Sequence, residues 1–325
     1  MVFRCWPILL VGAFALTGRS WPATLPLTSW SQTRIADGGI VGNLYLPETG
    51  GRHPAVIVVG GSEGGVEWSA PLGSPLAQRG FAALALAYFG TDPLPQRLQA
   101  IPLEYFKLAI DRLRAHPSVD PARIGFIGFS KGAEAALLIA ATYPDVKAVV
   151  ASAPSHVAWQ GVTGDPATVA PSWTYNGAAV PFVPFDRSEP FTTTLDAYSR
   201  SLAKGRAIEA AAIRVERILG PILLFSGTDD RVWPSTLMAD LIIDRLTRAR
   251  FPMFHEHVRF DGAGHPVLGV PQAELSPVPP RILLRLGGTA ETNAKAKEES
   301  WRMTLEFLQR FLSTTNEALR RNKNP

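Results

Sequence analysis

Short apolar runs alternate with stretches of helical spacing along most of this chain. The apolar runs occupy residues 40–46, 55–59, 81–88, 124–127, 148–151, 222–225 and 254–260. The stretches with helical spacing between and after them occupy residues 69–78, 103–115, 131–143, 235–248 and 297–312. Such alternation predicts an α/β fold with a mainly parallel sheet and helices on both faces.

Two segments interrupt this alternation. Residues 21–39 are polar and contain proline, and we expect them to form a loose lead-in. The predicted domain spans 40–315, and a polar tail, 316–325, follows it. Residues 153–219 are rich in Pro, Gly and aromatic side chains and lie between two strands that should be neighbours. Long irregular segments in compact domains are usually functional or disordered, so 153–219 is predicted to be a lid over the site, with an irregular surface loop as the alternative.

The first twenty residues form a separate unit. Arg4 precedes an uncharged apolar run, 5–16, which small and polar residues then end. A basic start, a short apolar run and a polar exit are typical of a secretory signal peptide. The sequence therefore predicts export to the periplasm or the extracellular space, with no membrane span after processing. If the segment is not a signal, the protein is cytoplasmic.

Composition changes this picture little. The apolar fraction of 46% suits a globular core, and the formal net charge of +4 comes from scattered basic residues. No nucleic-acid partner is expected from such a pattern. Cys5, the only cysteine, lies inside the predicted signal, so a processed chain would hold no thiol or disulfide.

A Gly128-x-Ser130-x-Gly132 sequence directly follows the strand predicted at 124–127 and opens the helix predicted at 131–143. In this context the serine stands on a tight strand-to-helix turn, as the nucleophile of an α/β-hydrolase does. The flanking glycines remove Cβ atoms that would clash there. Ser130 is therefore the predicted nucleophile.

A serine hydroxyl needs a base, and the histidine comes last in the triad order of this fold. His265 alone fits both that order and a loop position after the last predicted strand. The acid should follow the strand at 222–225, where Asp229 and Asp230 are adjacent. Asp261 is a weaker candidate because it shares the loop of His265.

Two backbone N–H groups should form the oxyanion hole. One belongs to Lys131, directly after the nucleophile. The other comes from the glycine-rich loop 60–65, at Ser62 or Glu63, and the residues do not decide between them. No Gly-Lys-Ser/Thr follows this loop, so a phosphate-binding loop is disfavoured. Neither a metal nor an organic cofactor is expected.

The predicted lid carries six aromatic residues, and these could line an apolar acyl pocket. Trp159 and Phe182 are the proposed pocket residues, while packing of the rings onto the core is the alternative. The six are Trp159, Trp173, Tyr175, Phe182, Phe185 and Phe191.

Together these segments resemble the C-terminal catalytic domain of acyl-CoA thioesterases and bile acid-CoA:amino acid N-acyltransferases, which is related to dienelactone hydrolases. The resemblance covers about 40–315. It rests on residues 60–65, 80–90, 103–106, 127–134, 146–150, 220–230, Trp233 and 262–265.

The resemblance implies an α/β-hydrolase fold with the lid between strands 6 and 7, and a Ser130–Asp230–His265 triad, because the family's acid falls on the second aspartate. It also implies cleavage of a carboxylic thioester or ester through an acyl-serine. A serine nucleophile favours hydrolysis over transfer, since the N-acyltransferases use cysteine. Acyl transfer to an amine or alcohol, and a non-catalytic binding protein on the same scaffold, are the alternatives.

Overall fold

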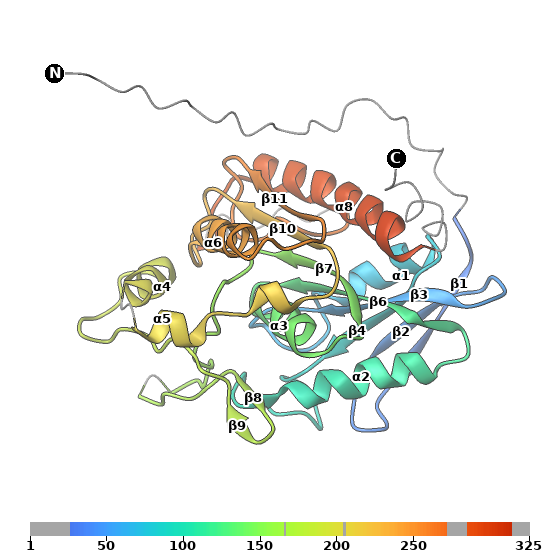
Figure 1. The fold of residues 1–325 in the computed structure, drawn as a ribbon, viewed down its shortest axis with the longest axis horizontal. Coiled ribbons are helices and arrows are strands. Elements are labelled where there is room, and N and C mark those ends of the chain that lie inside the picture. Colours follow the sequence, from blue (N-terminus) through green and yellow to red (C-terminus); the bar gives the residue numbers. More distant parts are fainter. Residues whose placement is uncertain (1–26, 166, 204–205, 272–284, 314–325) are drawn as a thin grey trace.

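A computed structural model describes residues 27–165, 167–203, 206–271 and 285–313. The predicted signal peptide, 1–20, and the polar tail, 316–325, lie outside these residues. An eight-stranded sheet forms the centre of the described chain, in the order β1-β2-β4-β3-β6-β7-β10-β11 (Figure 1). Its strands are β1 (Trp30–Ile35), β2 (Val41–Pro47), β3 (His53–Val59), β4 (Ala82–Ala87), β6 (Val119–Phe129), β7 (Val146–Ser152), β10 (Ile222–Gly227) and β11 (His255–Phe260).

The sheet is parallel from β4 to β11, and only the pairs β1–β2 and β2–β4 are antiparallel. Buried parallel strands need apolar side chains on both faces, and all seven residues of β3 and all six of β4 are buried. Helices α1 (Ala70–Ala77) and α8 (Ala290–Leu312) share one apolar cluster with the sheet. Helices α2 (Leu103–Ala115), α3 (Lys131–Thr142) and α6 (Ser235–Arg248) share the cluster on the other face. The predicted fold class is therefore confirmed.

The expectation of a loose lead-in over 21–39 was wrong for its second half, because β1 pairs with β2 along its whole length, from Trp30 opposite Pro47 to Ile35 opposite Gly42. The four central residues of β1 are exposed and only Ile35 is buried, so the strand has no apolar run or alternation that a sequence pattern could reveal. Backbone pairing with a neighbour, and not side-chain burial, makes this edge strand.

Residues 153–219 lie between β7 and β10, the sixth and seventh strands of the sheet along the chain, and we call them the insertion. It contains β8 (Trp173–Tyr175), β9 (Ala178–Ala179), α4 (Thr194–Leu202), α5 (Arg206–Ala211) and the 3-10 turn η1 (Val215–Arg217). Strand β8 pairs with β5 (Ile101–Pro102), just before α2. In Figure 1 the insertion projects to one side of the sheet. Among the described residues, no helix is both long and apolar enough to cross a membrane.

Helix α3 approaches β3 so closely that only glycine fits at Gly132. A Cβ there would lie 2.2 Å from the carbonyl oxygen of Gly60 and 2.7 Å from that of Val59. Gly128 has the same constraint, since its Cβ would lie 2.2 Å from the carbonyl oxygen of Gly132. Both glycines of the Gly-x-Ser-x-Gly sequence therefore permit contact between backbones, as the sequence predicted.

We predict that Gly132→Ala lowers the free energy of unfolding by about 1–3 kcal/mol or more, because backbone must move to admit the methyl group. Gly50→Ala is the control, since a Cβ at Gly50 meets nothing within 4 Å. Urea unfolding of both variants measures the difference. Equal midpoints would show that α3 can shift freely and that the close approach is not required.

Candidate active site

Ser130 occupies the turn between the last residue of β6 and the first residue of α3. Its backbone has φ 54° and ψ −119°, a conformation that costs a non-glycine residue about 1–3 kcal/mol. The turn projects the side chain from the sheet at the carboxyl end of β6. The Ser130 amide donates to the carbonyl of Ser152 on β7, which holds the strained turn in place at 2.9 Å.

Three side chains from three separate segments meet at this turn. The distance from Ser130 Oγ to His265 Nε2 is 2.9 Å, and that from His265 Nδ1 to Asp230 Oδ2 is 2.8 Å. Asp230 follows β10 and His265 follows β11, so both come from the carboxyl ends of neighbouring parallel strands. All three residues are buried, at 5%, 7% and 4% exposure for Ser130, Asp230 and His265. With Asp230 ionised, Nδ1–H donates to the carboxylate and Nε2 is left to accept the serine proton.

The Asp230 carboxylate is held by more than the histidine. Its Oδ1 accepts from the amides of Val232, at 2.9 Å, and Trp233, at 3.2 Å. Its Oδ2 also accepts from the Ser235 hydroxyl, at 2.6 Å. These donors fix the orientation of a buried negative charge. Sequence reasoning missed Ser235, whose only signal was its position at the start of the helix after the strand.

Asp229 points elsewhere. Its carboxylate accepts from Arg231 Nε, at 3.1 Å, and from the amide of Gly288, at 2.8 Å. Desolvation raises the pKa of the Asp229 carboxyl, but the hydrogen bonds from Gly288 and Arg231 together with the charge of Arg231 outweigh it, so that the pKa is lowered. The Asp261 carboxylate accepts from the Thr228 hydroxyl, at 3.1 Å. Of the three candidate acids, the structure brings Asp230 to His265.

The imidazole of His265 lies among aromatic rings. Phe129, directly before the serine, is 5.0 Å away between ring centroids, and Trp233 is 5.8 Å away in an edge-on arrangement. The His265 amide donates to the carbonyl of Leu286, at 2.8 Å, which pins the loop after β11. His257 on β11 contacts Ser226 on β10 and Asp240 on α6, and it takes no part in the contacts of the serine.

The predicted oxyanion donors come from two segments that both adjoin the serine. Lys131 is the first residue of α3, so its N–H has no acceptor within the helix. In the 60–65 loop, Gly61 lies against the serine, since a Cβ on Gly61 would be 3.0 Å from Ser130 Cβ. Ser62 and Glu63 follow in the same turn, and the choice between their N–H groups stays a prediction.

The Glu63 side chain curls back over this turn. Its Oε1 accepts from the Gly61 amide at 2.7 Å. The residue as a whole is exposed, but its carboxyl end faces inward, and this desolvation raises the pKa of the Glu63 carboxyl. An acidic side chain therefore lies beside the position expected for the oxyanion hole, whereas the sequence pattern pointed only to the backbone N–H of Glu63.

The two proposed pocket residues do not form one pocket. Trp159 is fully buried in an apolar cluster with Val157, Tyr198 and Trp233, among others. Phe182 is half-buried and packs against the separate cluster on the α3 face of the sheet. Trp159 is therefore a packing residue and not an accessible wall, because the cluster takes up all of its surface.

Two further features bear on ligand binding in the described ranges. No group of three or more His, Cys, Asp or Glu side chains there is arranged to hold a metal ion. A cavity of about 250 Å³ lies between the end of α3 and the insertion, and its lining includes Leu138, Val180 and Arg217. It does not include the serine.

Comparison with known proteins relates this chain to acyl-CoA thioesterases and N-acyltransferases. Residues 101–314 match the family described as BAAT / Acyl-CoA thioester hydrolase C terminal. The chain is 29% identical over 294 residues to the mouse peroxisomal succinyl-coenzyme A thioesterase, covering 87% of this chain and 66% of that protein. It is 32% identical over 286 residues to the mouse acyl-coenzyme A amino acid N-acyltransferase 1, covering 86% and 65%. The chain thus spans about two thirds of the length of these relatives.

Solved structures share the fold at lower identity. One is a dienelactone hydrolase-like promiscuous phosphotriesterase from metagenomic libraries, with a TM-score of 0.55 and 17% identity, covering 88% of this chain and 100% of the other. Another is a puromycin-hydrolysing peptidase of Mycobacterium tuberculosis, with a TM-score of 0.54 and 17% identity, covering 88% and 40%. These likenesses show a dienelactone hydrolase-like α/β fold.

We predict that Asp230→Asn lowers turnover of an activated ester by about 10⁴-fold, because an amide favours the wrong imidazole tautomer. Asp229→Asn is the matched control, since the neighbouring carboxylate contacts Arg231 and Gly288. Steady-state kinetics of the two purified variants measure the difference. A larger loss at Asp229 would contradict the geometry described above.

Proposed function

The chain belongs to the BAAT / acyl-CoA thioester hydrolase family, and from that premise we propose that it hydrolyses an acyl thioester or ester through an acyl intermediate on Ser130. The observation that carries the proposal is the continuous hydrogen-bonded series from Ser130 through His265 to Asp230. Several relatives are named as acyl-coenzyme A thioesterases, which supports a thioester as the substrate class.

The first half of the reaction forms the acyl-enzyme. Ser130 Oγ attacks the carbonyl carbon while its proton passes to His265 Nε2, and Asp230 stabilises the resulting imidazolium. The carbonyl oxygen becomes an oxyanion, which the Lys131 N–H and an N–H of the 60–65 loop stabilise. The C–S or C–O bond then breaks, and the leaving thiolate or alkoxide takes the proton from His265.

The second half releases the acyl group. Water enters the position of the departed group, gives a proton to His265 and attacks the acyl carbon. The second tetrahedral intermediate uses the same N–H donors. Its collapse breaks the bond to Ser130 Oγ, which recovers the proton from His265. The products are a carboxylic acid and a free thiol or alcohol, and every group in the site returns to its starting state.

Acyl transfer to an amine is the second candidate, because the relatives also include enzymes named as amino acid N-acyltransferases. In that reaction an amine replaces water in the second half. A serine nucleophile favours hydrolysis, as the sequence resemblance implies.

A panel of acyl-CoAs and p-nitrophenyl esters of increasing chain length tests the proposal. The wild type should release free thiol or nitrophenol, and Ser130→Ala should lower the rate by roughly 10⁴–10⁶-fold. Mass spectrometry of the products with glycine added separates hydrolysis from transfer. If the wild type cleaves no member of the panel, the proposed substrate class is wrong. An acyl-glycine as the main product would favour transfer.

We also infer that the protein is exported, on the signal-like pattern of residues 1–20. Fractionation of the native host, with sequencing of the mature N-terminus, tests this. The expected result is a trimmed chain outside the cytoplasm. A chain that starts at Met1 and remains in the cytosol would contradict export and would place the protein beside the intracellular pool of acyl-CoA.

A further inference from the structure

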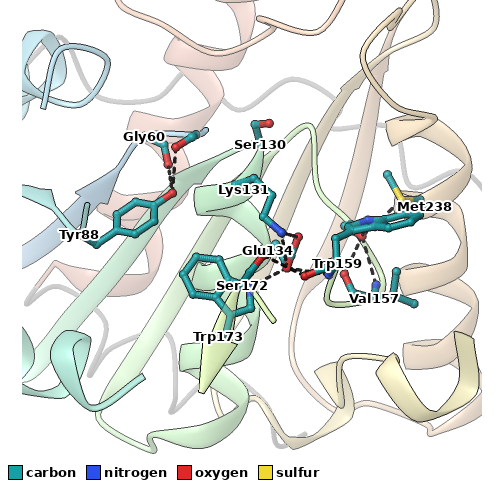
Figure 2. Close-up of polar contacts among 12 residues, drawn as sticks. Gly60, Tyr88, Ser130, Lys131, Glu134, Val157, Trp159, Ser172, Trp173 and Met238 are labelled. Atoms are coloured by element: carbon teal, nitrogen blue, oxygen red, sulfur yellow. Dashed lines mark hydrogen bonds and ion pairs between the residues drawn. The ribbon is translucent and has the colours of Figure 1, made fainter. Parts of the chain in front are cut away.

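A fully buried ion pair lies directly beneath the nucleophile. Lys131 and Glu134 are 1% and 0% exposed, on the first turn of α3. The Lys131 Nζ donates to both carboxylate oxygens of Glu134, at 2.8 Å and 2.6 Å (Figure 2). Burial raises the pKa of the Glu134 carboxyl and lowers that of the Lys131 ammonium, and each charge opposes the shift of the other. The triad chemistry uses neither side chain.

Glu134 also holds the insertion at two points. Its Oε1 accepts from the amide of Trp159, at 3.0 Å, and from the indole N–H of Trp173, at 2.6 Å. The Lys131 ammonium lies 5.5 Å from the centre of the Trp173 ring, a cation–π distance. Figure 2 shows the carboxylate at the centre of these contacts, with Ser130 above them. One carboxylate therefore joins the helix of the nucleophile to two separate parts of the insertion.

Trp173 extends this network to the other side of the oxyanion hole. Its ring lies 5.7 Å from that of Tyr88, which is 2% exposed at the end of β4. The Tyr88 hydroxyl donates to the carbonyls of Gly60 and Gly61, at 3.0 Å each. Those two residues begin the loop that is expected to supply the second oxyanion donor. Both sides of the hole are thus supported from Trp173 and Glu134.

Trp159 links the same carboxylate to the histidine. Its ring contacts Tyr198 edge-on at 4.7 Å, Tyr198 contacts Trp233 at 5.2 Å, and Trp233 contacts His265 at 5.8 Å. The Trp159 indole N–H donates to the Ser155 hydroxyl at 2.9 Å, which fixes the plane of the ring. Packing side chains thus connect Glu134 to the catalytic base as well.

Stability alone is a weak reason for such a pair. Removing two charges from water is costly, and apolar residues of similar volume often give an equal or greater free energy of unfolding. The pair also fixes the orientation of the groups that it joins, because charge-assisted hydrogen bonds have short lengths and preferred angles. An oxyanion hole requires that accuracy, since its donors act only when aimed at the developing charge.

We propose that Glu134, paired with Lys131, is a positioning residue that fixes the Lys131 N–H and the 60–65 loop as the two halves of the oxyanion hole. The proposal rests on the proposed role of Ser130 as the acylated nucleophile. The Lys131 side chain shares the task, whereas its backbone N–H contacts the substrate oxygen.

The test uses the full chain with Lys131→Met and Glu134→Gln combined. This double variant removes both charges, keeps an amide oxygen for the two tryptophan N–H groups and leaves the backbone N–H of residue 131 unchanged. The matched control is Lys107→Met with Asp111→Asn, which removes an exposed pair on α2 whose members are 31% and 50% exposed.

Three measurements distinguish positioning from simple support of the fold. They are the melting temperature, the rate at which a fluorophosphonate labels Ser130, and the affinity for a trifluoromethyl ketone, which forms a tetrahedral oxyanion adduct. The double variant should melt within a few degrees of the wild type. Its labelling rate and ketone affinity should fall at least ~10-fold, because loss of one oxyanion donor costs ~10²–10³-fold in other hydrolases. The control should change neither.

A folded double variant whose labelling rate and ketone affinity lie within about twofold of the wild type would overturn the proposal. If the double variant does not fold, Trp173→Phe takes its place, since it removes the indole N–H and keeps a ring against Tyr88. A several-fold slower labelling of that variant supports the role, and an unchanged rate refutes it. Labelling requires no substrate, so a wild type that labels at Ser130 but cleaves no thioester would refute only the proposed substrate class.

Discussion

The strained turn at Ser130 is the constraint on which the rest of the site depends. A serine at φ 54° must be held by its surroundings, and here a β-strand ends and a helix begins within one residue. The backbone of α3 then runs so close to β3 that Gly132 has no room for a Cβ. As a consequence the first turn of the helix is buried, and the side chains of Lys131 and Glu134 are enclosed with it.

Two buried carboxylates, Asp230 and Glu134, organise the surroundings of this turn by the same physical means. Asp230 accepts from two amides, a hydroxyl and the imidazole. Glu134 accepts from an ammonium, an amide and an indole. A buried carboxylate is costly unless its oxygens are satisfied, so each one requires several donors to converge. That requirement joins segments far apart in the chain into one site.

The insertion belongs to this arrangement more than its composition suggests. Its aromatic residues have two roles. Trp159 packs in a buried cluster beside Tyr198 and Trp233. Trp173 packs against Tyr88, which holds the start of the 60–65 loop. Trp159 cannot also line an open acyl pocket while its surface is covered. Aromatic side chains supply large apolar area for either purpose, so their number in a segment does not separate the two roles.

The sequence by itself determined the fold class and brought out Ser130 and His265, because these follow from local patterns. Apolar runs of strand length, a Gly-x-Ser-x-Gly turn and a histidine in the last loop are all read within a few residues. Asp230 needed more, since Asp229 has the same chemistry and only the resemblance to a family separated them. Strand β1 was not predicted because it is held by backbone hydrogen bonds, which leave no pattern in the sequence.

The partners of Ser235 and Glu134, and the burial of Trp159, were decided by tertiary structure alone. Glu134 accepts from Trp173, 39 positions away, and Trp159 is buried in a cluster with Trp233, which follows β10. Ser235 is only five positions from Asp230, but their contact depends on the shape of the turn between them. No local pattern encodes which donors will converge on a buried carboxylate.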